Sequence, residues 1–142
     1  MKEQQQNESI GMLFIEICKR RRNKKNELLS EANLYEGQDI LLHYLAIADG
    51  QTMSELAAKV CVQAATLSTM IRRMEANGLI RKEADPHDKR AHRIYFTAKG
   101  REVQALTCRI WSELDKRTLK DLSADEKKLL DQLLKKVLKN LA

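Results

Sequence analysis

The sequence predicts a mainly α-helical protein of one domain, or of two small interleaved ones. A length of 142 residues fits that size. Aromatic residues make up only 4% of the chain, so the core must consist of Leu, Ile, Val, Met and Ala, which is typical of helices packed against helices. A hydrophobic content of 43% is too high for a disordered chain, and one proline and five glycines are too few for a collagen-like or linker-like one.

No segment of the sequence is suited to a membrane or to secretion. The longest uncharged apolar stretch, residues 40–48, is far shorter than the roughly 20 residues that a spanning helix needs. Near the N-terminus, Glu16 interrupts the apolar run and the basic cluster follows it, which is the reverse of a signal peptide. The three cysteines lie far apart and form no C-x-x-C pair, so neither a disulfide framework nor a zinc site is indicated, and we expect a protein of a reducing cytoplasm.

The first element is a long helix over residues 7–31. Its apolar residues recur at helical spacing, at Ile10, Leu13, Phe14 and Ile17. The basic run at residues 19–25 has two interpretations, a phosphate-binding patch or the solvated face of the helix. The second is the commoner role of such a run.

Two short helices follow. Residues 40–48 form an apolar helix, and Gly50 behind it suits a left-handed C-terminal turn. The next helix is expected over residues 53–59, because Thr52 and Glu55 have the spacing of a capping box.

The fourth helix, over residues 63–77, has two faces of different character. Leu67, Met70, Ile71 and Met74 form one buried stripe. The other face carries short polar side chains and then two arginines, at Gln63, Thr66, Ser68, Thr69, Arg72 and Arg73. A face that only meets solvent tends toward Glu and Lys, so this face suits contact with the base edges and phosphates of nucleic acid.

A two-stranded β-hairpin is predicted after this helix. Residues 79–84 and 91–97 lose the helical period and bracket a polar turn. Two helices joined by a short turn and followed by a hairpin make a winged helix-turn-helix. Residues 71–101 hold nine Lys/Arg against four Asp/Glu, whereas the rest of the chain is nearly neutral. Charge concentrated in this way is typical of a nucleic-acid contact surface.

Two further helices complete the predicted set of about six. Thr97 caps the first, which runs to about residue 120, and Ser123 with Glu126 forms a second capping box that opens the other. The last helix carries seven Leu or Val residues, more apolar surface than a small monomer can hide. We therefore expect the two ends of the chain to form a dimer interface.

The hairpin also carries a motif at fixed spacing. It consists of Asp88, Arg90, Ile94, Thr97 and Gly100, with Phe96 before the threonine. This motif resembles the wing pattern D-x-R-x-x-x-I-x-L-T-x-x-G of the MarR family of bacterial transcriptional regulators, with Phe in place of Leu. Leu34 and Gln38 match a weaker element of the family, and the order of helices agrees over nearly the whole chain.

The resemblance implies an obligate homodimer that binds double-stranded DNA. Residues 1–34 and 98–142 would be dimerisation helices, and residues 35–97 the winged DNA-binding domain. Each winged domain would bind one half of a palindromic operator, with half-sites roughly 34 to 36 Å apart.

Arg90 would enter the minor groove, with Asp88 pairing with it or with a neighbouring cation; the ordinary alternative is a surface ion pair. The expected DNA-binding residues of the wing are Asp88, Lys89, Arg90, His92 and Arg93, in addition to the six on the fourth helix. Because residues 62–65 offer no good N-cap, the identity of the base-contacting residues stays open by a position or two.

The resemblance also implies regulation. Members of the family respond to small anionic or phenolic molecules, and the preferred mechanism is a repressor released by such an effector. A second hypothesis is oxidant sensing at Cys18, where Arg21 and Arg22 would favour the thiolate. Burial as a small hydrophobic residue is the commoner role of such a cysteine, and we also expect it of Cys61 and Cys108.

The sequence contains no pattern for catalysis or for a metal. His43, His87 and His92 lack ligand spacing, and His43 is expected to pack in the second helix. No nucleophile motif, phosphate-binding loop or dinucleotide motif is found, so we expect neither an enzyme nor a cofactor. The remaining alternative is a winged-helix module for RNA or for a protein partner, because a fold does not dictate its ligand.

Overall fold

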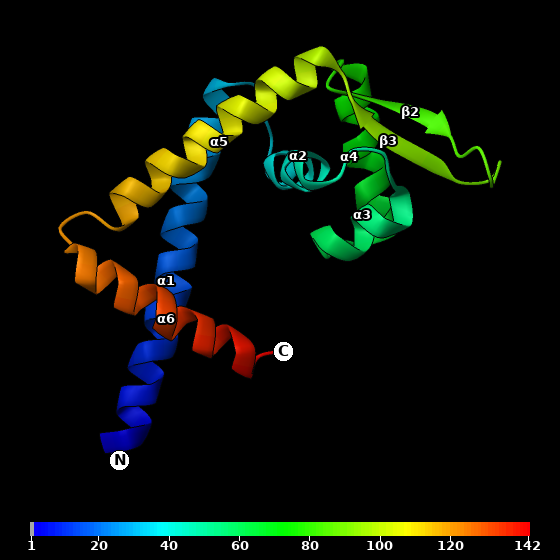
Figure 1. The fold of residues 1–142 in the computed structure, drawn as a ribbon. Helices are drawn as coiled ribbons and strands as arrows, with labels where there is room; N and C mark the ends of the chain where they lie inside the picture. Colours follow the sequence, from blue (N-terminus) through cyan, green and yellow to red (C-terminus); the bar gives the residue numbers. More distant parts are fainter. Residues whose placement is uncertain (1) are drawn as a thin grey trace.

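A stem of three helices carries a compact winged body (Figure 1). The computed structural model describes the backbone of residues 2–142 and the side chains of residues 9–142. The stem consists of α1 (Lys2–Glu31), α5 (Ala98–Thr118) and α6 (Ala124–Asn140). The winged body consists of α2 (Gln38–Ile47), α3 (Met53–Val60), α4 (Ala64–Ala76) and three short strands. The six helices and the hairpin confirm the predicted mainly α, winged helix-turn-helix fold.

The sheet has three strands, where the sequence predicts two. β2 (Ile80–Ala84) and β3 (His92–Phe96) pair antiparallel with Ile80 opposite Phe96, and β1 (Gln51–Thr52) adds to the other edge of β3. The sequence does not reveal β1, because two residues are too few to show the alternation of a strand. This strand ties the segment between α2 and α3 to the base of the wing.

Three helices begin at the caps that the sequence predicts. Thr52 Oγ1 accepts a hydrogen bond from the Glu55 amide at 3.2 Å, and the Glu55 carboxylate accepts one from the Thr52 amide at 3.0 Å. Ser123 and Glu126 form the same capping box at α6, and Thr97 caps α5. These bonds satisfy amide groups that a helix start otherwise leaves without a partner.

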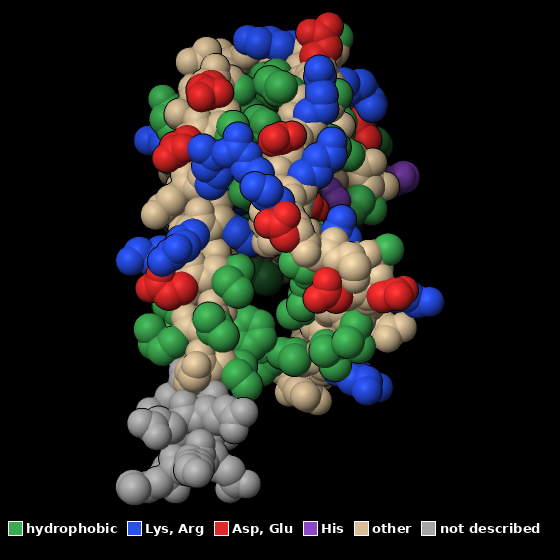
Figure 2. All heavy atoms as spheres, turned by 90° about the vertical axis from the view of Figure 1, so that its left-hand side faces the viewer, with side chains coloured by type: hydrophobic (Ala, Val, Ile, Leu, Met, Phe, Trp, Pro, Cys, Tyr) green, Lys and Arg blue, Asp and Glu red, His purple; other side chains and the backbone are tan. Residues whose placement is uncertain are grey.

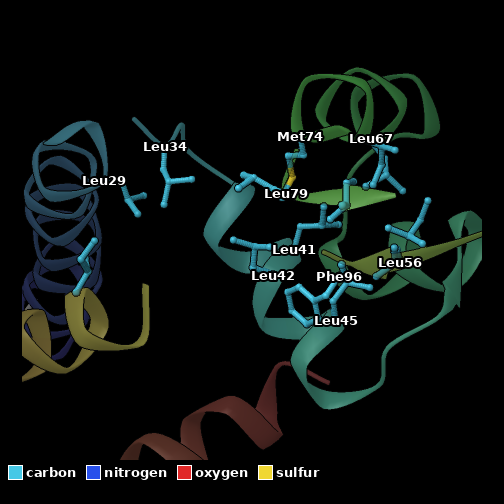
Figure 3. Close-up of a cluster of buried hydrophobic side chains, with 14 residues drawn as sticks. Leu29, Leu34, Leu41, Leu42, Leu45, Leu56, Leu67, Met74, Leu79 and Phe96 are labelled. Atoms are coloured by element: carbon cyan, nitrogen blue, oxygen red, sulfur yellow. The ribbon is translucent and has the colours of Figure 1, made fainter. Parts of the chain in front are cut away.

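A core of aliphatic side chains and Phe96 lies between α2, α3, α4 and the sheet (Figure 3). Leu41, Leu42 and Leu45 of α2 point into it and are completely buried. The predicted stripe of α4 is confirmed, because Leu67, Ile71 and Met74 are buried and Met70 is half-buried. Leu29 continues the core to the end of α1, so the stem packs onto the winged body through apolar contact.

Gly100 lets the first turn of α5 lie against the start of the wing. A Cβ at this position would lie 1.9 Å from the carbonyl oxygen of Leu79. No larger residue fits there without movement of the backbone. The neighbouring Thr97 also donates its hydroxyl to the Gly78 carbonyl oxygen at 2.5 Å. The winged body is therefore held firmly where α5 begins.

The basic run of α1 is largely engaged within the chain. Arg21 pairs with Asp115 of α5 at 3.0 Å, and Lys25 pairs with Asp39 of α2 at 3.2 Å. These contacts favour a structural role over a phosphate-binding patch for residues 19–25. None of the helices that the structure describes is both long and apolar enough to cross a membrane.

The prediction that the three cysteines are buried is wrong. Cys18, Cys61 and Cys108 are all exposed. Cys61 ends α3 in a left-handed conformation with φ 57°, and the buried seam of α5 leaves Cys108 facing outward. His43 does pack as expected, with its ring centroid 5.0 Å from that of Trp111.

Candidate nucleic-acid interface

The outward face of α4 presents the polar residues predicted to contact nucleic acid. Thr66, Thr69 and Arg73 lie along one line of the helix and are exposed. Thr69 donates its hydroxyl to the carbonyl oxygen of the residue four positions earlier, at 3.1 Å. Arg72 is exposed on the neighbouring line, whereas Ser68 is half-buried.

Gln63 lies at the N-cap of α4 but does not cap it. Its side chain is exposed and makes no hydrogen bond to the first turn of the helix. The amide groups of that turn therefore lack a side-chain acceptor and carry the partial positive charge of a helix start. This end of α4 is suited to an approaching base edge or phosphate.

Two carboxylates shape the turn of the wing. Asp85 Oδ1 accepts a hydrogen bond from the His87 amide at 2.8 Å, and Asp88 Oδ1 accepts one from the Arg90 amide at 3.0 Å. The sequence predicts that Asp88 pairs with a cation, but it restrains Arg90 through the backbone instead. The side chains of Lys89 and Arg90, like that of His92 at the start of β3, are exposed.

Arg93 links the start of the wing turn to the segment before β1. Its Nε donates to Asp85 Oδ2 at 3.1 Å, and its Nη1 donates to the Gly50 carbonyl oxygen at 2.8 Å. The hydrogen bond from the His87 amide, with help from the Arg93 guanidinium, lowers the pKa of Asp85 although burial opposes the shift. The sequence prediction groups Arg93 with the DNA-binding side chains and misses Asp85, whose only signal is its place before Pro86 in a turn.

The nine Lys and Arg side chains of residues 71–101 divide into those with a carboxylate partner and those without one. Three arginines pair with carboxylates, Arg81 with Glu83, Arg93 with Asp85 and Arg101 with Asp49. The other six have no ion-pair partner among the side chains described, namely Arg72, Arg73, Lys82, Lys89, Arg90 and Lys99, the last of which donates to the Asn77 carbonyl oxygen at 2.8 Å. Four of these six lie on α4 or at the tip of the wing, so most of the unpaired positive charge is displayed on the two elements that a winged helix uses for DNA.

The stem exposes apolar side chains that its own chain does not cover. Figure 2 shows them gathered on the lower part of the molecule, on both sides of an opening between α1 and α6. They include Ile10, Leu13, Phe14 and Ile17 of α1 and Leu129, Leu133, Leu134 and Leu138 of α6, which are 41–70% exposed. No residue of α6 is buried.

Several hollows lie beside α5, and two of them also border α2. The larger, of about 480 Å³, lies between α2, α5 and the start of α6, and its lining includes His43, Cys108, Trp111, Lys116 and Lys127. The other, of about 300 Å³, lies between α1, α2 and α5, and its lining includes Cys18, Arg21, Arg22 and Lys25. Both place cationic groups beside apolar surface at the junction of stem and winged body.

Known proteins resemble this chain in sequence. The MarR family model matches residues 35–92. The transcriptional regulator HosA of Escherichia coli O127:H6 is 40% identical over 96 residues, which cover 66% of this chain and 70% of HosA. The multiple antibiotic resistance protein MarR of Escherichia coli K12 is 28% identical over 130 residues, which cover 91% of this chain and 90% of MarR.

The fold agrees with these matches. A crystal structure of a mutant MarR from Escherichia coli, complexed with operator DNA, has a TM-score of 0.81 and 27% identity, and covers 92% of this chain and 94% of that one. Membership of a family of regulators also agrees with the expectation that the chain is not an enzyme. The wing motif, the sequence matches and the shared fold lead to one conclusion, that this chain belongs to the MarR family of transcriptional regulators.

Proposed function

We propose that the protein is a sequence-specific repressor that binds palindromic double-stranded DNA as a homodimer and is released by a small effector. The placement of the free cations carries this proposal. Arg72 and Arg73 on α4, and Lys89 and Arg90 on the wing, have no carboxylate partner among the described residues. Phosphates supply the missing negative charge.

The two elements have different tasks on the duplex. In the major groove, α4 presents Gln63, Thr66 and Thr69 to base edges, while Arg72 and Arg73 contact phosphates. Ser68 is half-buried and contributes least.

On the wing, Arg90 enters the minor groove and Lys89 and His92 contact adjacent phosphates. Asp88 restricts the direction of Arg90, because its carboxylate accepts a hydrogen bond from the Arg90 amide. Arg93 acts indirectly in this scheme, since its contacts with Asp85 and Gly50 keep the wing in place.

The exposed apolar faces of the stem support the homodimer. Residues 1–34 and 98–142 form the dimerisation helices in this proposal, and residues 35–97 form the DNA-binding domain. A second copy would cover the leucines of α6 and the apolar face of α1, which this chain leaves in water. Two-fold symmetry then matches a palindromic site.

The larger hollow beside α5 supports the effector. Trp111 offers an aromatic face and Lys116 and Lys127 offer two cations, which suits a small anionic or phenolic molecule. Such a molecule would contact both α2 and the stem, and would favour an angle between them at which the two α4 helices no longer match the half-sites. We place this regulation in the bacterial cytoplasm, where the operator lies.

The test is binding to the DNA upstream of the protein's own gene, over a series of salt concentrations and against random duplex. We expect Arg90→Ala to weaken binding at least tenfold and to lower the slope of log affinity against log salt by about 1.8, which is about 0.9 for each of the two copies of Arg90 in the dimer. Arg109→Ala, which removes an exposed arginine of α5, is the matched control and should change little. Equal, weak binding of all three proteins to every duplex would contradict the proposal.

The two alternatives from the sequence receive less support. The matches to transcriptional regulators favour duplex DNA over an RNA or protein ligand. Among the side chains of residues 9–142, no contact of Cys18 favours oxidant sensing over effector binding. Adding candidate anionic effectors to the DNA-binding assay tests the regulatory part directly, and we expect one of them to lower affinity.

A further inference from the structure

A buried carboxylate joins the winged body to two helices of the stem. Asp39 is the second residue of α2, and its side chain is completely buried. Its Oδ2 accepts a hydrogen bond from Trp111 Nε1 of α5 at 2.8 Å and pairs with Lys25 Nζ of α1 at 3.2 Å. One oxygen atom therefore links α1, α2 and α5.

Stability alone does not explain a carboxylate at this position. Asp39 Oδ1 has no hydrogen-bond partner in the described part of the chain, and a buried acceptor in that state costs free energy. Apolar side chains in place of both members of the buried ion pair would fill the site without this cost. What the carboxylate adds is direction, because a hydrogen bond and an ion pair fix the relative orientation of three helices more tightly than apolar contact does.

The chain joins stem and winged body at two places, between α1 and α2 and at the start of α5, and the link lies close to the first and far from the second. Trp111 is 13 residues beyond Ala98, the first residue of α5, which corresponds to about 20 Å along the helix. A hydrogen bond at that distance opposes rotation of the winged body about the start of α5. The other ion pair between α1 and the start of the winged body, Arg22 with Glu36, is more than half exposed and therefore weaker.

We infer that Asp39 is a positioning residue that sets the angle of the winged body on the stem, and with it the half-site spacing that the dimer accepts. This inference rests on the proposed function. A change of angle occurs in both protomers, so it alters the distance between the two α4 helices and leaves the DNA-binding surface of each helix intact. Loss of the link should therefore relax spacing preference without weakening contact with a single half-site.

The experiment uses three duplexes. Selection from a randomised duplex pool with the wild-type protein supplies the palindrome, and the duplexes carry it at native spacing, with two base pairs inserted at its centre, or as one half-site. The variant Lys25→Met/Asp39→Leu removes both charges together, so that neither charge is left buried and unpaired, and it also removes the acceptor of Trp111 Nε1. Asp39→Asn is the milder second variant, and Glu36→Gln is the matched control on the exposed pair. Thermal unfolding establishes that each protein is folded.

We expect the wild type and Glu36→Gln to prefer native spacing at least tenfold. In Lys25→Met/Asp39→Leu the preference should fall to threefold or less, with half-site affinity within twofold of the wild type. Asp39→Asn should lie between them. The chain has a single tryptophan, Trp111, so its fluorescence emission should shift in both Asp39 variants and not in the control.

Different results would overturn the role of Asp39 and the proposed function. Full spacing preference in the folded variants, or unchanged tryptophan emission, would overturn the role of Asp39. An equal loss of affinity for the half-site and for the palindrome would also overturn it, because it would show a general structural defect. Failure of the wild type to select any duplex would overturn the proposed function itself, and this role with it.

Discussion

The winged body and the stem distribute their apolar and charged side chains in opposite ways. The winged body buries its leucines and leaves Arg72, Arg73 and Arg90 unpaired among the described residues. The stem exposes Leu13 and the leucines of α6, and it pairs Arg21 and Lys25 within the chain. The winged body thus has a closed apolar core and displays unpaired cations, whereas the stem leaves apolar side chains in contact with water.

The largest effect should come from placing charges on the exposed apolar face of α6. Leu134→Asp/Leu138→Asp places two charges where the proposed partner covers α6, and we expect the dimer dissociation constant to rise at least about 1,000-fold, or roughly 4 kcal/mol. Sedimentation velocity measures this directly. Lys136→Asp, on the polar face of the same helix, is the control. A double variant that remains dimeric at micromolar concentration would show that α6 is not in the interface.

Matched truncations should sharpen the comparison. Leu56 is completely buried in the winged body, so Leu56→Ala should lower the free energy of unfolding by about 2–5 kcal/mol. Leu129 is 55% exposed on α6, so Leu129→Ala should act through the dimer and its effect should depend on protein concentration. Urea unfolding at two protein concentrations separates the two cases. If both substitutions lowered the free energy of unfolding equally, and neither effect depended on protein concentration, the distinction between a buried and an interface leucine would be contradicted.

The two capping boxes allow a third comparison. Thr52→Ala removes the N-cap of α3, whose Leu56 belongs to the core, and should lower the free energy of unfolding by about 1 kcal/mol. Ser123→Ala removes the N-cap of α6, which buries no residue in its own chain, so it should change dimer affinity more than unfolding of the winged body. Thermal unfolding and sedimentation of the same samples test this. A larger loss of winged-body stability from Ser123→Ala would be inconsistent with it.

The smallest effect concerns the wing and pH. Asp85 has a lower pKa in the folded protein than in the unfolded chain, so its contacts stabilise the fold above about pH 4, and this stabilisation disappears as the pH falls through the folded pKa. Asp85→Asn should therefore lower the melting temperature at pH 7 and have little effect at about pH 2. An equal difference in melting temperature between the variant and the wild type at both pH values would mean that the charge of Asp85 does not contribute to stability.

Local signals in the sequence predicted most of the fold. The apolar period of α4, the capping boxes at Thr52 and Ser123, and the turn between the wing strands each depend on residues within a few positions of one another. Such signals survive without tertiary structure, because helical spacing and caps are properties of neighbouring residues. The polar face of α4 and the exposed tip of the wing were predictable for the same reason, although their contact with DNA stays a prediction.

The sequence by itself therefore determined the helices, their caps, the wing and its family. Only the tertiary structure decided the third strand, the exposure of the cysteines, the engagement of Arg93 by Asp85 and Gly50, and the link from Asp39 to Trp111. The last bond joins residues 72 positions apart, and the bond from Arg93 to Gly50 spans 43. No local pattern specifies such pairs, because they form only when packing of the core brings distant segments together.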